Sequence, residues 1–143
     1  MFTGIVEEKG IITSIDKKQH SLALKIEAKI VTADISVGDS ISVNGVCLTV
    51  TSFNNKGFTV DVIPETYRGT SLATKTIGQE VNLERAMAAD GRFGGHFVSG
   101  HVDTVGKIKR LWTEDNATYI YISVETEGLL FVALKGSITI DGT

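Results

Sequence analysis

The chain has 143 residues, 42% hydrophobic and 22% charged, as expected for one soluble globular domain or one domain plus part of another. Its net charge of -3, without a Lys/Arg cluster, argues against nucleic-acid binding, and its apolar runs are far shorter than the ~18–20 residues of a membrane span. The N-terminus resembles no secretory signal, and the single cysteine, Cys47, fits a reducing compartment. We therefore expect a cytoplasmic protein that binds neither nucleic acid nor membranes.

Residues 40–49 predict a β-hairpin. Asn44-Gly45 is a preferred pair for a two-residue type I′ turn, because both turn positions need a positive φ. Alternation along the two strands then places two sets of side chains on opposite faces. The expected core face carries Ile41, Val43, Val46 and Leu48, and the polar face carries Ser40, Ser42, Cys47 and Thr49. A polar face of a barrel is usually solvated, but a free thiol is usually buried, so we expect this face to be covered by something.

The remaining elements are short. Alternating apolar and polar residues predict strands at 58–62 and 119–124. Pro64 favours a short helix over 64–66, and 83–88 is a second helical candidate. The glycine-rich segment 89–95 predicts a domain boundary. Short strands separated by turns over ~90 residues favour an all-β fold, a small closed or nearly closed barrel.

An internal repeat organises the chain. Residues 38–45 (GDSISVNG) return as residues 135–142 (KGSITIDG), at an offset of 97. Residues 3–7 (TGIVE) return as residues 99–103 (SGHVD), at an offset of 96. A unit of ~96 residues is too long for a solenoid repeat and indicates a duplicated small domain.

The repeat predicts a domain organisation. We expect a first β-barrel over residues 1–90, a linker over 91–97, and an incomplete second barrel over 98–143. In the second copy, Ile138 and Ile140 are expected in the core, with Ser137 and Thr139 on the opposite face and Asp141-Gly142 as the turn. Lys135 replaces Gly38 and so breaks the symmetry of the repeat.

The candidate chemistry involves two histidines and the cysteine. A metal site at His96 and His101 would need Cys47 and Asp103 as further ligands, and the spacing departs from the paired motifs of zinc sites. Imidazole suits acid–base catalysis, while two structural or surface histidines fit the sequence equally well. Nothing adjacent in sequence activates Cys47, so an inert core thiol remains the default against a nucleophile.

Four stretches in this order together resemble the riboflavin synthase family: MFTGIV (1–6), NGVCLTV (44–50), VIPET (62–66) and GGHFVSGHVD (94–103), with KGSITIDGT (135–143) as the second-copy counterpart. The resemblance implies a duplicated six-stranded Greek-key β-barrel with no metal or redox cofactor. It implies a full-length homotrimer in which the first barrel of one subunit faces the second barrel of a neighbour. The implied reaction dismutates two molecules of 6,7-dimethyl-8-ribityllumazine into riboflavin and 5-amino-6-ribitylaminopyrimidinedione.

The resemblance also implies site residues. Ligand contacts of the first barrel match Gly4, Ile5, Val6, Cys47, Leu48, Thr49, Asp61, Val62, Ile63, Pro64, Glu65 and Thr66. Those of the second barrel match Gly100, His101, Val102 and Lys135. The positions that the family uses in catalysis correspond to Phe2, Ser40, Cys47, His96 and His101 of this sequence. We expect His101 to assist proton removal from the C7 methyl group of one lumazine, and Ser40 or Cys47 to help add a nucleophile to the other.

Two alternatives are open. One is a non-catalytic lumazine- or riboflavin-binding protein of the antenna type; the joint presence of Ser40, Cys47, His96 and His101 favours the enzyme. The other is a barrel that binds nucleic acid or sugar, which the acidic charge and the single Trp disfavour.

Because the second copy stops within its turn, we expect residues ~104–143 to be poorly protected. We also expect the chain to bind lumazine or riboflavin but to turn over slowly, with a homodimer of first barrels or lumazine synthase as further partners.

Overall fold

The computed structural model describes residues 1–17 and 21–143. Contacts between residues divide the chain into two units, one of residues 1–102 with 139–143 and one of residues 103–138. The domain limits expected from the repeat (1–90, 91–97 and 98–143) stay a prediction. Among the described residues, no helix has the length and apolar character needed to cross a membrane.

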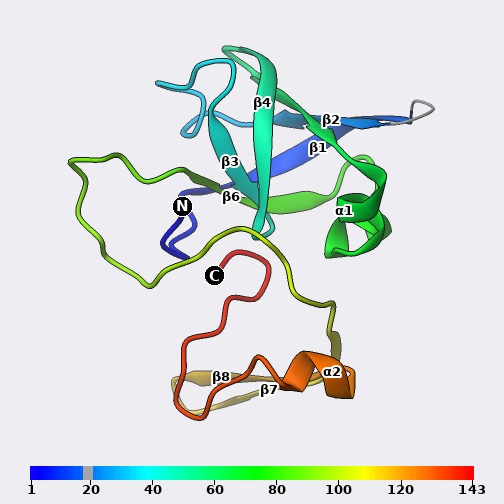
Figure 1. The fold of residues 1–143 in the computed structure, drawn as a ribbon, viewed down its shortest axis with the longest axis vertical. Helices are drawn as coiled ribbons and strands as arrows, with labels where there is room; N and C mark the ends of the chain where they lie inside the picture. Colours follow the sequence, from blue (N-terminus) through cyan, green and yellow to red (C-terminus); the bar gives the residue numbers. More distant parts are fainter. Residues whose placement is uncertain (18–20) are drawn as a thin grey trace. The chain divides into compact units, whose positions relative to one another are not determined.

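The first unit is built on a closed antiparallel barrel of six strands (Figure 1). In chain order the strands are β1 (Glu8–Lys17), β2 (Leu22–Glu27), β3 (Ser40–Val43), β4 (Val46–Asn54), β5 (Gly57–Val62) and β6 (Glu80–Arg85). Around the barrel their order is β1-β2-β5-β4-β3-β6, and β6 pairs with β1 to close the ring. The chain crosses from β2 to β3 without pairing them, as in a Greek key. The all-β closed barrel expected from the sequence is confirmed.

The core of the barrel follows from the period of two along each strand. Alternate apolar side chains point inward and are almost fully buried: Ile12, Leu24, Ile26, Ile41, Val43, Val46, Leu48, Val50, Phe58, Val60, Val62, Val81 and Leu83. Full burial of one such side chain contributes about 1.5–3 kcal/mol before entropy is counted. The barrel is therefore a packed core, and polar chemistry is left to its outer face and rims.

The β3–β4 hairpin forms in the predicted register. Val43 pairs with Val46, and Ser42 with Cys47. Asn44 and Gly45 have φ values of 48° and 79°, both positive, as a type I′ turn requires. The four expected core side chains are buried, while on the opposite face Ser42 is buried, Ser40 and Cys47 are half-buried and Thr49 is exposed.

Two short helical turns follow β5, namely α1 (Pro64–Arg68), with Pro64 in its first turn as expected, and the 3₁₀ turn η1 (Ser71–Thr74). The helix expected over 83–88 is wrong, because residues 80–85 form β6. That strand pairs with β1 on one side and β3 on the other. Tertiary pairing thus overrides the local helical preference of the sequence around Glu84.

The second unit contains β7 (Lys107–Glu114), β8 (Ala117–Ser123) and the short helix α2 (Thr126–Leu129) (Figure 1). The β7–β8 register reproduces that of β1–β2, shifted by 96 residues on both strands. Ile12 pairs with Ile26 in the first copy, and Ile108 pairs with Ile122 in the second. In both hairpins the register shifts directly after this pair. The structure thus extends the repeat to a stretch where few residues are identical.

The end of the second repeat is partly as expected. Asp141 and Gly142 have φ values of 48° and 89°, close to those of Asn44 and Gly45, so the predicted turn is confirmed. Ile140 and Thr143 exchange two backbone hydrogen bonds of 2.9 and 3.1 Å across it. The expected core positions are wrong, since Ile138 and Ile140 are 56% and 44% exposed. Within the described residues no strand pairs with 137–140, so no sheet is present to bury their side chains.

Candidate functional site

The polar face of the β3–β4 hairpin is covered by the segment that contains Gly100. The Cys47 amide donates a hydrogen bond of 2.9 Å to the Gly100 carbonyl oxygen. Gly100 has φ +81°, and a Cβ added to it would lie 2.5 Å from the Cβ of Cys47. Only glycine permits both this backbone conformation and this close approach. The cover expected from the presence of a thiol is therefore residues 98–100, which lie directly before His101 and Val102.

The N-terminal segment holds this covering segment in place. Phe2 and Val98 exchange two backbone hydrogen bonds, of 2.8 and 3.1 Å. The Phe2 ring is fully buried, and its Cε2 atom lies 3.0 Å from the position of a Cβ on Gly100. The expected site residues Phe2, Cys47 and Gly100 thus form one packed cluster.

The two candidate histidines differ in their surroundings. The His96 amide donates to the Thr3 carbonyl oxygen (3.0 Å), its ring lies against Gly4, and its Nε2 is 3.0 Å from Thr139 Oγ1. The side chain of His101 is exposed, while its amide donates to Ser99 Oγ (3.1 Å). His96 is therefore a fixed residue within the cluster, and His101 is the histidine that is free to meet a ligand from solvent.

The remaining expected contacts lie at several places. The β4–β5 register pairs Val50 with Val60, so that Thr49 and Asp61, both exposed, come next on the outer face. The side chains of Leu48 and Val62 face the core, and both residues are buried. Ile63 to Thr66 lie at the exposed to half-buried start of α1. Lys135 belongs to the second unit, where it has a positive φ of 60°.

Metal binding at the histidines finds no support in the part of the chain that is described. Across residues 1–17 and 21–143, no three His, Cys, Asp or Glu side chains are grouped so that they could hold a metal ion. The cluster presents hydroxyl, thiol and imidazole groups, together with backbone amides and carbonyls.

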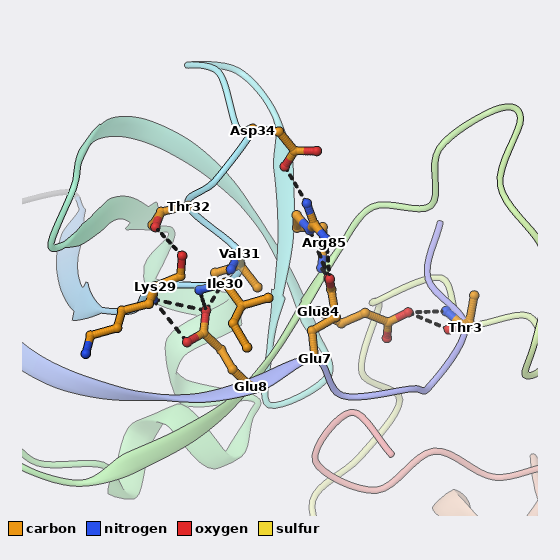
Figure 2. Close-up of polar contacts among 10 residues, drawn as sticks. All are labelled: Thr3, Glu7, Glu8, Lys29, Ile30, Val31, Thr32, Asp34, Glu84 and Arg85. Carbon is orange, nitrogen blue, oxygen red and sulfur yellow. Dashed lines mark hydrogen bonds and ion pairs between the residues drawn. The ribbon is translucent and has the colours of Figure 1, made fainter.

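Glu84 is a buried residue of this region that no sequence motif indicated. Its side chain is only 5% exposed, because the N-terminal segment covers the outer face of β6 at this point. Glu84 Oε1 accepts hydrogen bonds from the Thr3 amide (2.6 Å) and the Thr3 hydroxyl (2.7 Å) (Figure 2). Its Oε2 accepts one from the Gly4 amide (3.1 Å). No motif marks Glu84, since its partners are 80 residues or more away in sequence.

Three further carboxylates, those of Glu7, Glu8 and Asp34, hold the start of β1 and the loop after β2 (Figure 2). Glu7 accepts hydrogen bonds from the Arg85 amide and guanidinium, and Asp34 accepts one from the same guanidinium. The Glu8 carboxylate accepts hydrogen bonds from the backbone amides of residues 29–31, at 2.6 to 3.2 Å. Hydrogen bonds to a charged acceptor are stronger than neutral ones, so these contacts fix the backbone at the start of β1 and in the loop after β2.

Glu7 predicts a pH dependence of stability. Burial acts to raise the pKa of Glu7, but the hydrogen bonds and charge of Arg85 outweigh it and hold the pKa below its ordinary value of 4.5. A carboxyl with a lowered pKa in the folded state stabilises the fold above its unfolded pKa, and this contribution is lost as the pH falls through the folded pKa. Glu7→Gln should therefore cost about 1–3 kcal/mol of unfolding free energy at pH 7. In urea denaturation, this difference from the wild type should shrink as the pH falls below 4.5.

The matched control for Glu7 is Glu80, whose exposed side chain pairs with Lys9. Glu80→Gln should change the unfolding free energy at pH 7 by less than about 1 kcal/mol. A Glu7→Gln difference that stays the same from pH 7 to pH 3 would contradict the assigned role of Arg85.

Comparison with known proteins places this barrel in a family. Residues 3–86, more than half of the chain, match the family model of the lumazine binding domain. The chain resembles a crystal structure of LumP complexed with riboflavin, with a TM-score of 0.88 over 99% of this chain and 77% of that one. At 24% identity this likeness shows the fold alone. The fold and the matched domain define the class of the protein as a lumazine-binding barrel.

The curated relatives narrow the class. The chain is 56% identical to riboflavin synthase of Bacillus amyloliquefaciens and 54% identical to that of Bacillus subtilis, in each case over 99% of the chain and 66% of the relative. It is 45% identical to riboflavin synthase of Mycobacterium tuberculosis, over 99% of the chain and 71% of that protein. The chain therefore belongs to the riboflavin synthase family. It spans about two thirds of the length of the relatives that it matches.

Proposed function

We propose that the protein is a riboflavin synthase, which converts two molecules of 6,7-dimethyl-8-ribityllumazine into riboflavin and 5-amino-6-ribitylaminopyrimidinedione. The observation that carries this proposal is the identity of 54–56% to riboflavin synthases along 99% of the chain. The cluster of Phe2, Cys47 and Gly100 supports it, because the residues expected from the family motifs meet at one place in the fold.

The proposed ligand site is the outer face of β4, between the N-terminal segment and the start of α1. Thr49 and Asp61 offer exposed polar groups there, and Gly100 brings His101 and Val102 to its edge. The other contacts proposed for this site are Gly4, Ile5, Val6, Cys47, Leu48, Val62, Ile63, Pro64, Glu65 and Thr66. Lys135 is proposed as a contact of the second-barrel site. Backbone amides and carbonyls at a strand edge suit the polar edge of a lumazine ring.

The proposed chemistry needs no oxidant, because a four-carbon unit leaves one lumazine and joins the other. A base removes a proton from the acidic C7 methyl group of the acceptor, and the ring delocalises the resulting charge. Exposed His101 is the proposed base, since a ring nitrogen of a neutral imidazole can accept the proton. Ser40 and Cys47 are proposed to help add water to the donor ring, and this water is released again by the end of the reaction. Fixed His96 keeps the N-terminal segment in position.

The proposed partners follow from the need to hold two identical substrates side by side. Two similar sites facing each other supply that arrangement, and the orientation they impose is itself a large catalytic contribution. We propose a homotrimer of the full-length protein, with first and second barrels of neighbouring subunits facing each other. A homodimer of first barrels, an association with lumazine synthase and a cytoplasmic location stay predictions.

The test is the reaction itself. The chain is incubated with 6,7-dimethyl-8-ribityllumazine, and both products are quantified by chromatography. The proposal predicts one riboflavin and one pyrimidinedione for every two lumazines consumed, with no requirement for added metal or oxidant. Tight binding of lumazine with no riboflavin formed would overturn the proposal in favour of a binding protein of the antenna type.

A further inference from the structure

Two adjacent residues of β6 hold the two ends of the N-terminal segment. The buried carboxylate of Glu84 accepts hydrogen bonds from Thr3 and Gly4. The guanidinium of Arg85 binds the Glu7 carboxylate (Figure 2). Between these two anchors lie Ile5 and Val6. The part of the chain expected to contact ligand is thus fixed at both ends by one strand of the barrel.

The Glu84 anchor has an unusual charge balance. Every hydrogen bond that the described residues give to its carboxylate comes from Thr3 or Gly4, two from backbone amides and one from a hydroxyl. No Lys or Arg forms an ion pair with it among these residues. A buried carboxylate is costly unless donors compensate it. If the Thr3–Gly4 backbone shifts while it still covers Glu84, the buried carboxylate loses donors that water cannot replace, so Glu84 favours one position of that segment.

A line of contacts connects this anchor to the proposed site. Thr3 accepts a hydrogen bond from the His96 amide, and its neighbour Phe2 exchanges two hydrogen bonds with Val98. Two residues further on, Gly100 accepts the hydrogen bond of the Cys47 amide. A shift of the Thr3–Gly4 backbone would therefore displace the segment that carries His101 as well as Ile5 and Val6.

We infer that Glu84 is a positioning residue for the lumazine site. It acts through the backbone of Thr3 and Gly4 and not by contact with the ligand. The inference rests on the proposed function, because it assigns Glu84 a role in that site. It distinguishes Glu84 from the other acidic residue of β6, Glu80, whose exposed side chain pairs with Lys9 on the neighbouring strand.

The experiment compares Glu84→Gln and Glu84→Ala with two control variants. Glutamine keeps one acceptor oxygen but turns an NH₂ group toward one of the donors, and alanine removes every acceptor. Glu80→Gln controls for loss of a charge on the same strand. Val81→Ala controls for loss of stability, because it opens a cavity in the core without touching Thr3 or Gly4. Riboflavin affinity is measured by fluorescence quenching and stability by urea denaturation.

We expect Glu84→Gln to raise the Kd for riboflavin about tenfold, and Glu84→Ala to raise it further. Glu80→Gln and Val81→Ala should keep the Kd of the wild type, although Val81→Ala unfolds more easily. Amide proton resonances of Thr3 and Gly4 should move upfield in Glu84→Gln, since a carboxylate acceptor is replaced by a weaker one. If Glu84→Gln does not fold, Thr3→Val serves instead: it removes the hydroxyl that donates to Glu84 and accepts from the Ile5 amide at 3.3 Å, and it leaves both backbone donors of Glu84 in place. It should raise the Kd by a smaller factor, about threefold.

Two results would overturn the inference. One is a Glu84→Gln variant that folds and binds riboflavin as the wild type does. The other is a Val81→Ala variant that loses affinity to the same degree, since the effect would then reflect stability alone. A wild-type chain that binds no riboflavin would instead refute the proposed function, and the Thr3 and Gly4 resonances would still report whether Glu84 anchors the segment.

Discussion

Replacement of Gly100 by alanine is expected to weaken riboflavin binding about a hundredfold. The new Cβ would lie 2.5 Å from the Cβ and 2.9 Å from the amide nitrogen of Cys47, and 3.0 Å from the Phe2 ring. The two Cys47 atoms belong to or adjoin the backbone of β4, so no side-chain rotation relieves the clash. The covering segment would have to lift away from the hairpin, which breaks the Cys47–Gly100 hydrogen bond and moves His101. Fluorescence titration with riboflavin measures the effect.

Gly38→Ala is the matched control for this substitution. Gly38 also has a positive φ, +99°, but an added Cβ would meet nothing within 4 Å. Both variants carry the backbone strain of a non-glycine residue at positive φ, about 1 kcal/mol, and only Gly100→Ala carries the clash. Gly38→Ala should therefore bind riboflavin as the wild type does. Equal losses of affinity in the two variants would show that the contact between Gly100 and Cys47 does not shape the site.

The largest expected effect on stability comes from Gly57→Ala. Gly57 starts β5 and pairs with Glu27 of β2 on one side and Asn54 of β4 on the other. A Cβ at this position would lie 2.0 Å from the carbonyl oxygen of Ile26. Because the obstacle is backbone within a closed barrel, β2 and β5 would have to separate. We expect a loss of about 3 kcal/mol or more in the free energy of unfolding, measured by urea denaturation.

Gly78→Ala is the control that separates the effect of this clash on stability from the effect of backbone strain. Gly78 has φ +89° and open space where its Cβ would lie, so about 1 kcal/mol is expected from strain alone. Similar losses in Gly57→Ala and Gly78→Ala would mean that the barrel wall accommodates a Cβ between β2 and β5, contrary to the geometry described here.

The elements that local rules determine could be predicted from the sequence. The Asn44-Gly45 turn needs positive φ at two positions, and the alternation that it sets fixes which side chains of the hairpin are buried. Its counterpart at Asp141-Gly142 follows the same rule. Pro64 starts α1 because its ring fixes φ at a value that suits the first turn of a helix.

The elements that depend on distant partners could not be predicted in this way. Residues 83–88 have a local helical preference, yet residues 80–85 form β6 because β1 and β3 offer hydrogen bonds on both sides. Ile138 and Ile140 repeat the pattern of core residues, yet a pattern buries a side chain only where a paired strand is present. Lys135 adopts a positive φ like its counterpart Gly38 in the first repeat, although the residue type differs between the two positions.

The same distinction holds for the candidate site. Family motifs identified Phe2, Cys47 and Gly100, and the fold brings these residues into contact. They gave no indication of Glu84, because its role depends on the docking of Thr3, which is 81 residues away in sequence. A carboxylate on the outer face of a strand is ordinarily solvated, so sequence pattern alone could not show that Glu84 is buried.

The most direct test of the central claim is to locate the ligand on the chain by NMR. Backbone amide resonances are recorded while riboflavin is titrated into the isotope-labelled protein. The proposed site predicts that the largest shifts fall on residues 4–6, 47–49, 61–66 and 100–102, with small changes over β1 and β2. Saturable shifts confined to other parts of the barrel, or no shifts at millimolar riboflavin, would contradict the assignment of the outer face of β4 as the lumazine site.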